Sequence, residues 1–499
     1  MTSNYVLTID QGTTSSRALL VDRNGSVAGM AKEPFRQIYP APGLVEHDPN
    51  EIWTSVQRAV EGALSGAGVG IGDVAAIGIA NQRETLVAWE RESGSPVHNA
   101  IVWQDRRTAP ICDDLRAARH EGNIASLTGL SLDPYFTGTK LTWLLNEHPD
   151  LRERGEHGEV LAGTVDSWLL WKLTGGTVHA TDFTNASRTL LFNTRRGRWD
   201  DELLELFGVP RAMLPKIRPS RSNFGTTKAD VLGAAIPITG IAGDQQAALF
   251  GQACMEPGQV KCTYGTGAFA LSPAGKRPLQ SEHGLLVSLG ASSGARGPEY
   301  VLEGSVFSAG AVVEWLQEGL GIIQQPADVE GLAASVTDTG GVHFVPAFTG
   351  LGAPHWDPGA RGTIMGLTRG TTSGHIARAA LESIAFSTAD LLDAMAEDLP
   401  EGVQELRVDG GASENDLLMQ MQADVTGVPI VRPENIETTA MGAAYLAGLG
   451  CGIWESVDEV NSLWKPGKTF EPQASADERA ERRAGWHRAV ERARGQAEA

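Results

Sequence analysis

Short apolar runs alternate with polar turns at the start of the chain. One run leads from Tyr5 to Asp10, a second covers Ala18–Asp22, and a third begins near Val27 after an Asn-Gly turn. Runs of this kind, bounded by Gly, Asn and hydroxyl residues, are typical of strands joined by tight turns. We therefore expect three consecutive β-strands.

The apolar spacing changes to that of a helix after residue 48. Asp48 is a good N-cap, Pro49 suits the first turn, and Glu51 completes the spacing of a capping box. Apolar residues then recur every four positions, at Ile52, Val56 and Val60. A strand over residues 74–80 follows and ends at Asn81-Gln82-Arg83-Glu84. This order of elements predicts the beginning of an α/β domain.

The same pattern returns near residue 240. A buried strand over residues 238–242 ends at Gly243-Asp244-Gln245, and a helix is expected from Gln246 to Phe250. Two further strand-like runs then flank the turn Gly265-Thr266-Gly267. Two hairpins with Gly-Thr tips, about half a chain apart, suggest a duplicated domain. We place the boundary near residue 251, which gives domains of residues 1–251 and 252–499.

Length and composition agree with two domains and narrow the partners. A chain of 499 residues is too long for one ordinary core. Hydrophobic residues make up 41% and charged residues 20%, which is normal for a globular enzyme. The formal net charge of −20 argues against nucleic acid or an anionic membrane surface as a partner. An anionic substrate would need local donors and a metal to overcome this field.

The cysteines and the apolar runs indicate the compartment. The cysteines form no C-x-x-C pair and have no His cluster beside them, which is typical of reduced, mostly buried thiols: Cys112, Cys254, Cys262 and Cys451. No apolar run reaches about 18 residues, and no leader-like stretch precedes the first strand. We therefore expect a cytoplasmic protein without a membrane span.

The first turn is the leading candidate for chemistry. Asp10 ends the first strand, and the turn after it carries four hydroxyls. An ordinary β-turn uses the same residue types. As a site, its backbone N–H groups would form an anion nest, and Thr13, Thr14 and Ser15 would donate to phosphate oxygens. Asp10 would hold Mg²⁺, and Arg17 would neutralise charge on the transferring group.

Three segments at strand ends each have a structural and a catalytic interpretation. Asp244 can cap the following helix, or act as the general base that phosphoryl transfer to an alcohol requires. The Gly410-Gly411 turn can be merely tight, or allow close approach of a nucleotide, with Asn415 as a helix cap or an adenine or ribose ligand. Arg83 and Glu84 can form a nearly neutral surface ion pair, or bind vicinal hydroxyls.

Aromatic residues and three other segments have plainer interpretations. Trp103, Tyr135 and Phe269 can pack as core or bracket a small carbon skeleton: these alternatives stay open. The following segments are not expected to be sites: Gly467-Lys468-Thr469, a partial P-loop match with Ser462 in place of the first Gly and expected to be a loop; Gly66–Gly72, which lacks the spacing of a dinucleotide fingerprint; and Asp477–Arg494, a charged helix with Trp486 and Val490 on one face that is expected to dock loosely.

The ordered set of motifs resembles the glycerol kinases of the sugar-kinase family, which has the actin-like ATPase fold. The resemblance covers nearly the whole chain, and it is carried by D-Q-G-T-T-S-S-R at Asp10, N-Q-R-E-T at Asn81, A-I-V-W-Q-D-R-R-T at Ala100, D-P-Y-F-T-G-T-K-L-T-W at Asp133, T-D-F-T-N-A-S-R-T at Thr181, I-A-G-D-Q-Q-A-A-L-F-G-Q at Ile241, T-Y-G-T-G at Thr263, V-P-A-F-T-G-L-G-A-P-H-W-D-P at Val345 and R-V-D-G-G-A at Arg407. It implies an α/β protein with two duplicated actin-like (ribonuclease H-like) domains around a central cleft.

The resemblance also implies ATP-dependent phosphorylation of glycerol to sn-glycerol 3-phosphate. Glycerol would bind Arg83, Glu84, Trp103, Tyr135, Asp244, Gln245 and Phe269. The phosphates and nucleotide would bind Thr13, Thr14, Ser15, Arg17, Thr266, Gly310, Glu314, Gly411 and Asn415. Asp244 would be the base, and Asp10 and Asp244 would position Mg²⁺. The family often has Gln in place of Glu314, whose carboxylate would repel a phosphate.

Two alternative functions stay open, and two forms of regulation known in relatives are not expected. The chain could be a related kinase acting on a pentulose or a longer polyol, or a nucleotide-driven binding protein of the same fold. Some relatives bind a sugar bisphosphate through a Gly-x-Arg loop, but Leu232–Ile236 has no Arg; others are phosphorylated on a His that Ser222–Gly225 lacks. A homo-oligomer, either a dimer or a tetramer, is expected.

Overall fold

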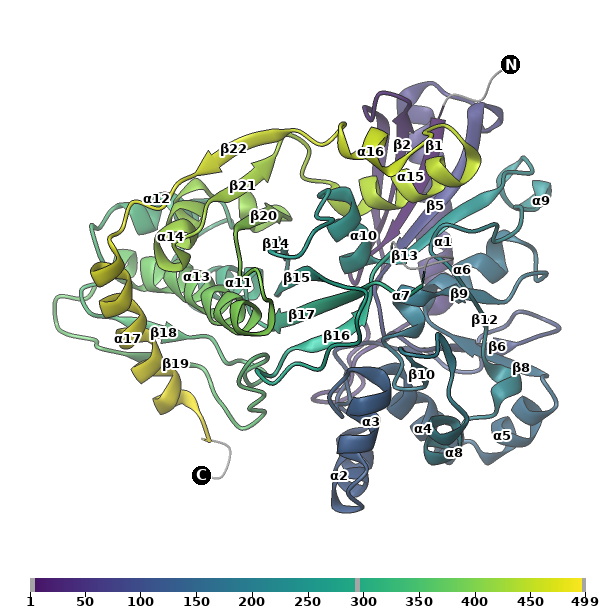
Figure 1. Ribbon diagram of the computed structural model, residues 1–499, viewed down its shortest axis with the longest axis horizontal. Helices are drawn as coiled ribbons and strands as arrows, with labels where there is room; N and C mark the ends of the chain where they lie inside the picture. The colour runs from purple at the N-terminus through teal and green to yellow at the C-terminus, as the bar shows by residue number, and fades with distance from the viewer. Residues whose placement is uncertain (1–4, 292–296, 496–499) are drawn as a thin grey trace.

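The N-terminal half of the chain is built on a five-stranded sheet (Figure 1). The structure, a computed structural model, describes residues 5–291 and 297–495. The strands of this N-terminal sheet are β1 (Tyr5–Gln11), β2 (Ser15–Asp22), β3 (Val27–Pro34), β5 (Val74–Asn81) and β13 (Ile238–Gly243), in the order β13-β5-β1-β2-β3. β1, β2 and β3 form the expected antiparallel meander, and β5 and β13 run parallel to β1.

The C-terminal sheet repeats this topology and adds one strand at each edge. Its central order β17-β15-β14-β20-β21 has the same antiparallel and parallel pairings as the N-terminal sheet. The strands are β14 (Gln259–Tyr264), β15 (Ala268–Gly275), β17 (Tyr300–Val306), β20 (Glu405–Asp409) and β21 (Ile430–Pro433), with β16 (Leu286–Leu289) and β22 (Pro466–Phe470) at the edges. The predicted duplication is therefore confirmed by sheet topology.

The other elements surround and connect the two sheets. Between β3 and β13 lie β4 (Glu46–His47), α1 (Pro49–Ala67), β6 (Val87–Glu90), β7 (Ala100–Ile101), α2 (Ala109–Ala117), α3 (Glu121–Thr128), α4 (Thr137–Glu147), α5 (Pro149–Glu156), β8 (Val160–Gly163), α6 (Val165–Leu173), β9 (Ala180–Asp182), α7 (Phe183–Ala186), β10 (Phe192–Asn193), β11 (Arg198–Trp199), α8 (Asp201–Phe207), β12 (Lys216–Arg218) and α9 (Ala229–Leu232). After β13 come α10 (Asp244–Gly251), α11 (Gly310–Glu318), α12 (Asp328–Ala334), β18 (His343–Val345), β19 (Thr363–Met365), α13 (Ser373–Asp398), α14 (Asp416–Thr426), α15 (Thr438–Cys451), α16 (Val457–Asn461) and α17 (Ala476–Ala493). Short 3₁₀ helices cover Ile71–Asp73, Arg211–Met213 and Gly411–Glu414.

Both sides of the central strand β1 are buried, each under a different helix. Leu7 and Ile9 of β1 share one core with α1, whereas Val6 faces a second core with α15. This follows from the alternation of side chains along a strand. Figure 1 shows α15 and α16, in yellow-green, beside the purple strands β1 and β2. A helix from the C-terminal half therefore completes the N-terminal core.

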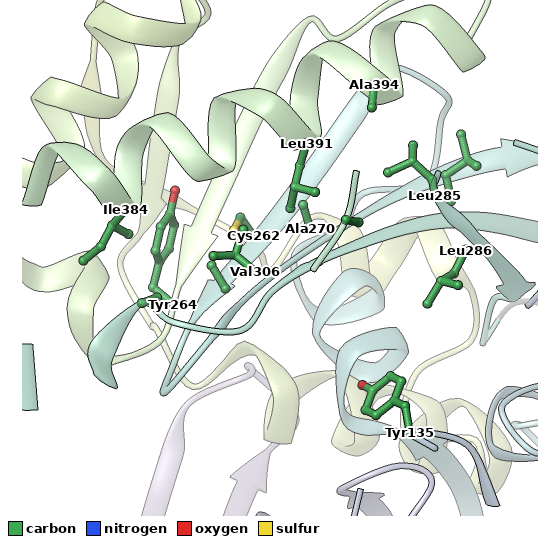
Figure 2. Packing of buried hydrophobic residues seen from close by; sticks show 14 of the residues in the cluster. Tyr135, Cys262, Tyr264, Ala270, Leu285, Leu286, Val306, Ile384, Leu391 and Ala394 are labelled. Atoms are coloured by element: carbon green, nitrogen blue, oxygen red, sulfur yellow. The ribbon is translucent and has the colours of Figure 1, made fainter. Parts of the chain in front are cut away.

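Helix α13 covers the C-terminal sheet. It is 26 residues long, and most of its buried residues are small or aliphatic. Figure 2 shows Leu391 and Ala394 pointing from this helix toward the sheet, in which Ala270 lies on β15. All three residues belong to the same buried cluster as Cys262 and Tyr264. The turns at the ends of the C-terminal strands are therefore supported by a closely packed layer formed by the sheet and α13.

Three local expectations are wrong. Asp48 does cap α1 by accepting the Asn50 N–H at 2.8 Å, but Glu51 forms no capping box, because its carboxylate pairs with Arg36 instead. Gly467-Lys468-Thr469 is not a loop: it lies in β22, an exposed edge strand whose polar residues give no apolar alternation. The expected loose docking of the C-terminal helix is also wrong, as the contacts of α17 show.

Helix α17 is held by buried aromatic and charged contacts. Trp486 is 2% exposed, stacks on Phe386 with ring centroids 5.5 Å apart, and donates its indole N–H to Asp390 at 2.7 Å. Arg483 donates to the same carboxylate at 2.8 Å. The sequence alone identified the apolar face of this helix but not its partners.

Among the described residues, the structure contains no helix with the length and apolar character of a membrane span. The state of the cysteines agrees with the expected reduced thiols. All four cysteines are free: three are buried, and Cys451 is exposed.

Close approach of α15 to the N-terminal sheet requires glycine at several positions, and this generates a stability prediction. A Cβ at Gly78 would lie 2.2 Å from the Ala443 carbonyl oxygen, so the helix would have to move. We expect Gly78→Ala to lower the free energy of unfolding by about 1–3 kcal/mol. Urea denaturation measures this change.

The matched control for that substitution is Gly66→Ala. Gly66 lies in α1 with no atom within 4 Å of the added Cβ. Alanine is a better helix former, so this variant should be unchanged or more stable by up to about 1 kcal/mol. Equal destabilisation by both substitutions would contradict the packing argument.

Candidate active site

One cavity of about 410 Å³ is lined by residues from both halves of the chain. The turn between β1 and β2 contributes Thr13 and Thr14, with Ser15 at the start of β2, and the equivalent turn between β14 and β15 contributes Gly265 and Thr266. Because the two sheets have the same topology, these turns occupy equivalent positions. Both Gly-Thr tips therefore face the same cavity.

Most of the predicted site residues meet in this cavity. Those lining it are Asp10, Thr13, Thr14, Ser15, Arg17, Arg83, Glu84, Trp103, Tyr135, Asp244, Gln245, Thr266, Phe269, Glu314 and Gly411. Gly310 and Asn415 are not among the lining residues. The Gly310 N–H donates to the Gly265 carbonyl at 2.9 Å, so this residue supports the second tip. Asn415 caps α14 by accepting the Leu418 N–H at 2.8 Å, as its structural interpretation predicts.

Asp10 and Arg17 lie at the first hairpin in a carboxylate-rich setting. Burial raises the pKa of Asp10 to about 6; Arg17 opposes this rise, and the carboxylates of Asp244 and Glu437 add to it. Arg17 pairs with Glu437 at 2.6 Å. Glu437 immediately precedes α15, so the C-terminal half already provides a partner for the cation of the first hairpin.

Arg83 and Glu84 are buried, so the surface-pair interpretation is wrong. They are 3% and 1% exposed, and their closest charged atoms are 3.9 Å apart. Arg83 instead donates to both carboxylate oxygens of Glu303, at 2.6 and 2.7 Å. Glu84 accepts from Arg188 at 2.5 Å. Glu84 also has a φ of 60°, an uncommon backbone conformation for a residue other than glycine.

Asp244 is the first residue of α10 and not its N-cap, which is Gly243. The helix-capping interpretation is therefore wrong. The Asp244 carboxylate accepts the Gln245 N–H at 2.7 Å and lies 3.2 Å from the Arg83 Nε. Its side chain is 27% exposed and lines the cavity. The carboxylate is thus oriented by neighbours yet accessible to a bound molecule.

Three aromatic rings form one wall of the cavity. The Trp103 ring meets Tyr135 at 5.7 Å and Phe269 at 6.1 Å, both nearly perpendicular. The Trp103 indole N–H donates to the Thr13 hydroxyl at 2.9 Å, which ties this wall to the first hairpin. Burial, together with Glu84, holds the pKa of Tyr135 well above its usual value, so its hydroxyl stays protonated.

Buried Lys140 supports the segment that presents Tyr135. Its ammonium donates to the backbone carbonyls of Pro134, Tyr135 and Phe136. Burial lowers the pKa of Lys140 to about 7. This lysine lies in the segment beginning at Asp133 that carries the family resemblance, although the motif alone did not assign it a role.

Sequence reasoning missed the partners that hold these side chains. These partners are Arg188, Lys261, Glu303 and Glu437. A further residue that was not expected in the site, Asp409, lines the cavity. Glu303 lies in a strand that is buried along its whole length, and Lys261 lies between two buried apolar residues, Val260 and Cys262. A charge inside such a strand is a usable signal, because a buried charge requires a partner. The sequence does not reveal which partner that is.

Comparison with known proteins gives the family. The N-terminal domain of the FGGY family of carbohydrate kinases matches residues 5–251, and the C-terminal domain of that family matches residues 260–451. A glycerol kinase of Trichlorobacter lovleyi is 58% identical over 495 residues, covering 99% of this chain and 100% of the relative. One of Deinococcus radiodurans is 55% identical, covering 98% and 97%.

A solved structure agrees with these sequence matches. The glycerol kinase of Plasmodium falciparum with ADP has a TM-score of 0.90 and 36% identity, covering 99% of this chain and 98% of that one. The duplicated sheets, the shared cavity and the full-length relatives lead to one conclusion: the chain belongs to the FGGY family of carbohydrate kinases.

Proposed function

We propose that the chain transfers the γ-phosphoryl group of ATP to glycerol, giving ADP and sn-glycerol 3-phosphate, the first step of glycerol catabolism. The observation that carries the proposal is the single cavity in which two Gly-Thr tips meet a polar pocket containing Arg83 and Asp244. The relatives named glycerol kinase, which match over nearly the full chain, support glycerol as the acceptor.

The acceptor pocket suits a short polyol. Arg83 supplies hydrogen-bond donors, and Glu84 and Asp244 supply acceptors, on one side of the cavity. Trp103 and Phe269 provide apolar surface for the carbon atoms on the other side. Vicinal hydroxyls on a three-carbon chain need this combination of paired polar groups and an apolar wall.

Asp244 is the proposed general base. A terminal hydroxyl placed beside its carboxylate would give up a proton as the oxygen attacks the γ-phosphorus. Arg83, at 3.2 Å, and the Gln245 N–H orient the carboxylate for this role. Little covalent assistance is needed, because positioning and charge neutralisation dominate phosphoryl transfer.

The two hairpins are the proposed phosphate clamp. Thr13, Thr14 and Ser15 would donate to phosphate oxygens from one side and Thr266 from the other. Arg17 would neutralise charge at the transferring group, exchanging part of its contact with Glu437 for the phosphate. Glu314 and Gly411 also line the cavity, which supports the proposed nucleotide side; Gly310 and Asn415 would act there from behind the lining.

The donor set fits Mg²⁺ bound together with a nucleotide. Asp10 and Asp244 line the same cavity and influence each other electrostatically. Within the described ranges, no group of three or more His, Cys, Asp or Glu residues could hold a metal by itself. Mg²⁺ suits such a site, because it commonly binds one or two carboxylates together with phosphates and waters. When bound, it would neutralise charge on the phosphates.

A substrate panel tests the proposed acceptor. With Mg²⁺-ATP as the phosphoryl donor, ADP release is measured in a coupled assay. The rate should depend on glycerol and be far lower with xylulose or gluconate as the acceptor. Robust turnover of xylulose or gluconate without turnover of glycerol would identify the chain as another kinase of the family. ADP release independent of any acceptor would favour a nucleotide-driven binding protein.

Replacing the proposed base separates binding from turnover. Asp244→Asn keeps the shape of the side chain but removes its ability to take a proton, so we expect kcat to fall by about 10²–10⁴-fold. ATP affinity, measured by calorimetry with Mg²⁺ present, should fall far less than kcat. Turnover close to that of the unaltered protein would refute the base assignment.

Asp10 is expected to reduce the stability of the empty site. Its pKa of about 6 in the folded protein lies above the usual value of 3.8, so the folded state holds the proton more tightly than the unfolded state. The cost therefore grows as pH rises from about 4 to 6 and is complete above pH 6.

Asp10→Asn removes this cost. In chelator-treated, nucleotide-free protein, the variant should be more stable above pH 6, by up to about 3 kcal/mol, and the difference should shrink toward pH 4. Urea unfolding at several pH values measures it, with turnover expected to be lost. A stability difference that does not vary with pH would contradict the assigned pKa.

A further inference from the structure

We propose that Glu303 and Lys261, both from the C-terminal domain, are positioning residues for the acceptor pocket of the N-terminal domain. The pocket is then complete only when the two domains are docked in the observed arrangement. The inference rests on the proposed function, because it identifies the residues that set the affinity of that same site for glycerol.

Glu303 holds Arg83 from across the domain boundary. It lies on β17, is fully buried, and accepts from both terminal nitrogens of Arg83, at 2.6 and 2.7 Å. Arg188 lies 3.2 Å away and itself holds Glu84. Burial alone would raise the pKa of Glu303, but Arg188 and Arg83 lower it to about 2. One carboxylate of the C-terminal domain thus fixes two cations beside the acceptor.

Lys261 holds Gln245 in the same way. It lies on β14 and is fully buried. Its ammonium donates to the side-chain oxygen of Gln245 and to the Thr263 hydroxyl at 2.9 Å, and it also reaches the Phe269 carbonyl at 3.2 Å. Gln245 and Phe269 both line the cavity. A second residue of the C-terminal domain therefore orients an acceptor-side amide and the backbone of the aromatic wall.

A third contact links the same groups. Arg83 donates to Gln246 at 3.1 Å, and Gln246 donates to the Ser288 hydroxyl on β16 at 3.1 Å. Arg83 is therefore bound through both Glu303 and Gln246 to strands of the C-terminal sheet. Within the N-terminal domain its charged neighbours are Asp244 at 3.2 Å and Glu84 at 3.9 Å.

These contacts give the pocket a dependence on domain docking. Without Glu303, the Arg83 guanidinium would turn toward Asp244 and Glu84, which are the groups that are to receive the acceptor hydroxyls. A guanidinium cannot lose its proton to relieve this conflict. Binding of glycerol and docking of Glu303 should therefore favour each other, since coupling between two binding events is reciprocal.

The test compares Glu303→Gln with the unaltered enzyme. The variant keeps the size of the side chain but loses its charge, and we expect the KM for glycerol to rise by about 10–100-fold, as for other groups that orient a ligand-binding side chain. The KM for ATP should stay within about twofold. Glycerol should also raise the Tm of the variant much less than that of the unaltered enzyme, whereas a nucleotide should raise both equally.

Two further variants keep the test decisive if Glu303→Gln folds poorly. Glu303→Asp retains the charge and should recover part of the glycerol affinity. Lys261→Met removes the donor to Gln245, to Thr263 and to the Phe269 carbonyl but leaves Glu303 in place, and it should raise the glycerol KM by about 3–10-fold. Both measurements use the full chain with Mg²⁺-ATP.

Asp390→Asn is the matched control. Asp390 is a buried carboxylate of the C-terminal domain paired with Arg483 and Trp486, and it does not line the cavity. This variant should lower Tm and leave the glycerol KM unchanged. If Glu303→Gln behaves like this control, Glu303 is only structural and the inference is wrong. If the unaltered enzyme shows no glycerol-dependent ADP release, the proposed function fails first, and the inference falls with it.

Discussion

The buried guanidinium of Arg83 constrains the active site more than any other group. Arginine stays charged inside a protein, and an unpaired buried charge is very costly. Arg83 is satisfied by Glu303 from one domain and by Asp244 from its own domain. The strand that carries Glu303 must therefore lie against the strand end that carries Arg83. This requirement fixes where the two sheets meet, and hence where a substrate can bind.

Duplication of the sheet places the phosphate groups of the site. In each sheet the first two strands form a hairpin whose tip contains Gly and Thr, and both tips face one cavity. The arrangement depends on support from the opposite half of the chain at two further points. Helix α15 completes the N-terminal core through contacts at Gly78, and Glu437, just before that helix, pairs with Arg17. Each half of the site is thus supported by the other half of the chain.

The sequence predicted the elements whose signal is local. The strands around Asp10, the Gly-Thr turns and the helix after Asp48 all follow from apolar spacing and turn residues. It failed where a tertiary partner decides the outcome. β22 is polar because it is an exposed edge strand, and Glu51 leaves its capping position because Arg36 is available.

The candidate site shows the same division. Asp244 was found because it directly follows a buried strand, and Tyr135, just before α4, because it lies in a sequence motif. Arg188, Lys261 and Glu303 were missed because their roles depend on groups from other segments, as far as 220 residues away in the case of Arg83 and Glu303. A single charged residue between buried apolar residues indicates that a charged or polar partner exists, but only the fold identifies that partner.

Charge balance in this cavity is the reason for proposing that a cation accompanies the nucleotide. Its charged lining residues are six carboxylates and three cations, namely Asp10, Glu84, Asp244, Glu314, Asp409 and Glu437 against Arg17, Lys32 and Arg83. The whole chain carries a formal charge of −20, so the surrounding field adds to the repulsion of phosphates. Two of the three cations are already paired, Arg17 with Glu437 and Arg83 with Glu303. Arg17 can be released toward a phosphate because its partner is partly exposed, whereas Arg83 cannot leave a fully buried carboxylate. Under the proposed function the remaining positive charge would come with the nucleotide, and Mg²⁺ held by Asp10 would supply it while removing the cost of that buried carboxylate.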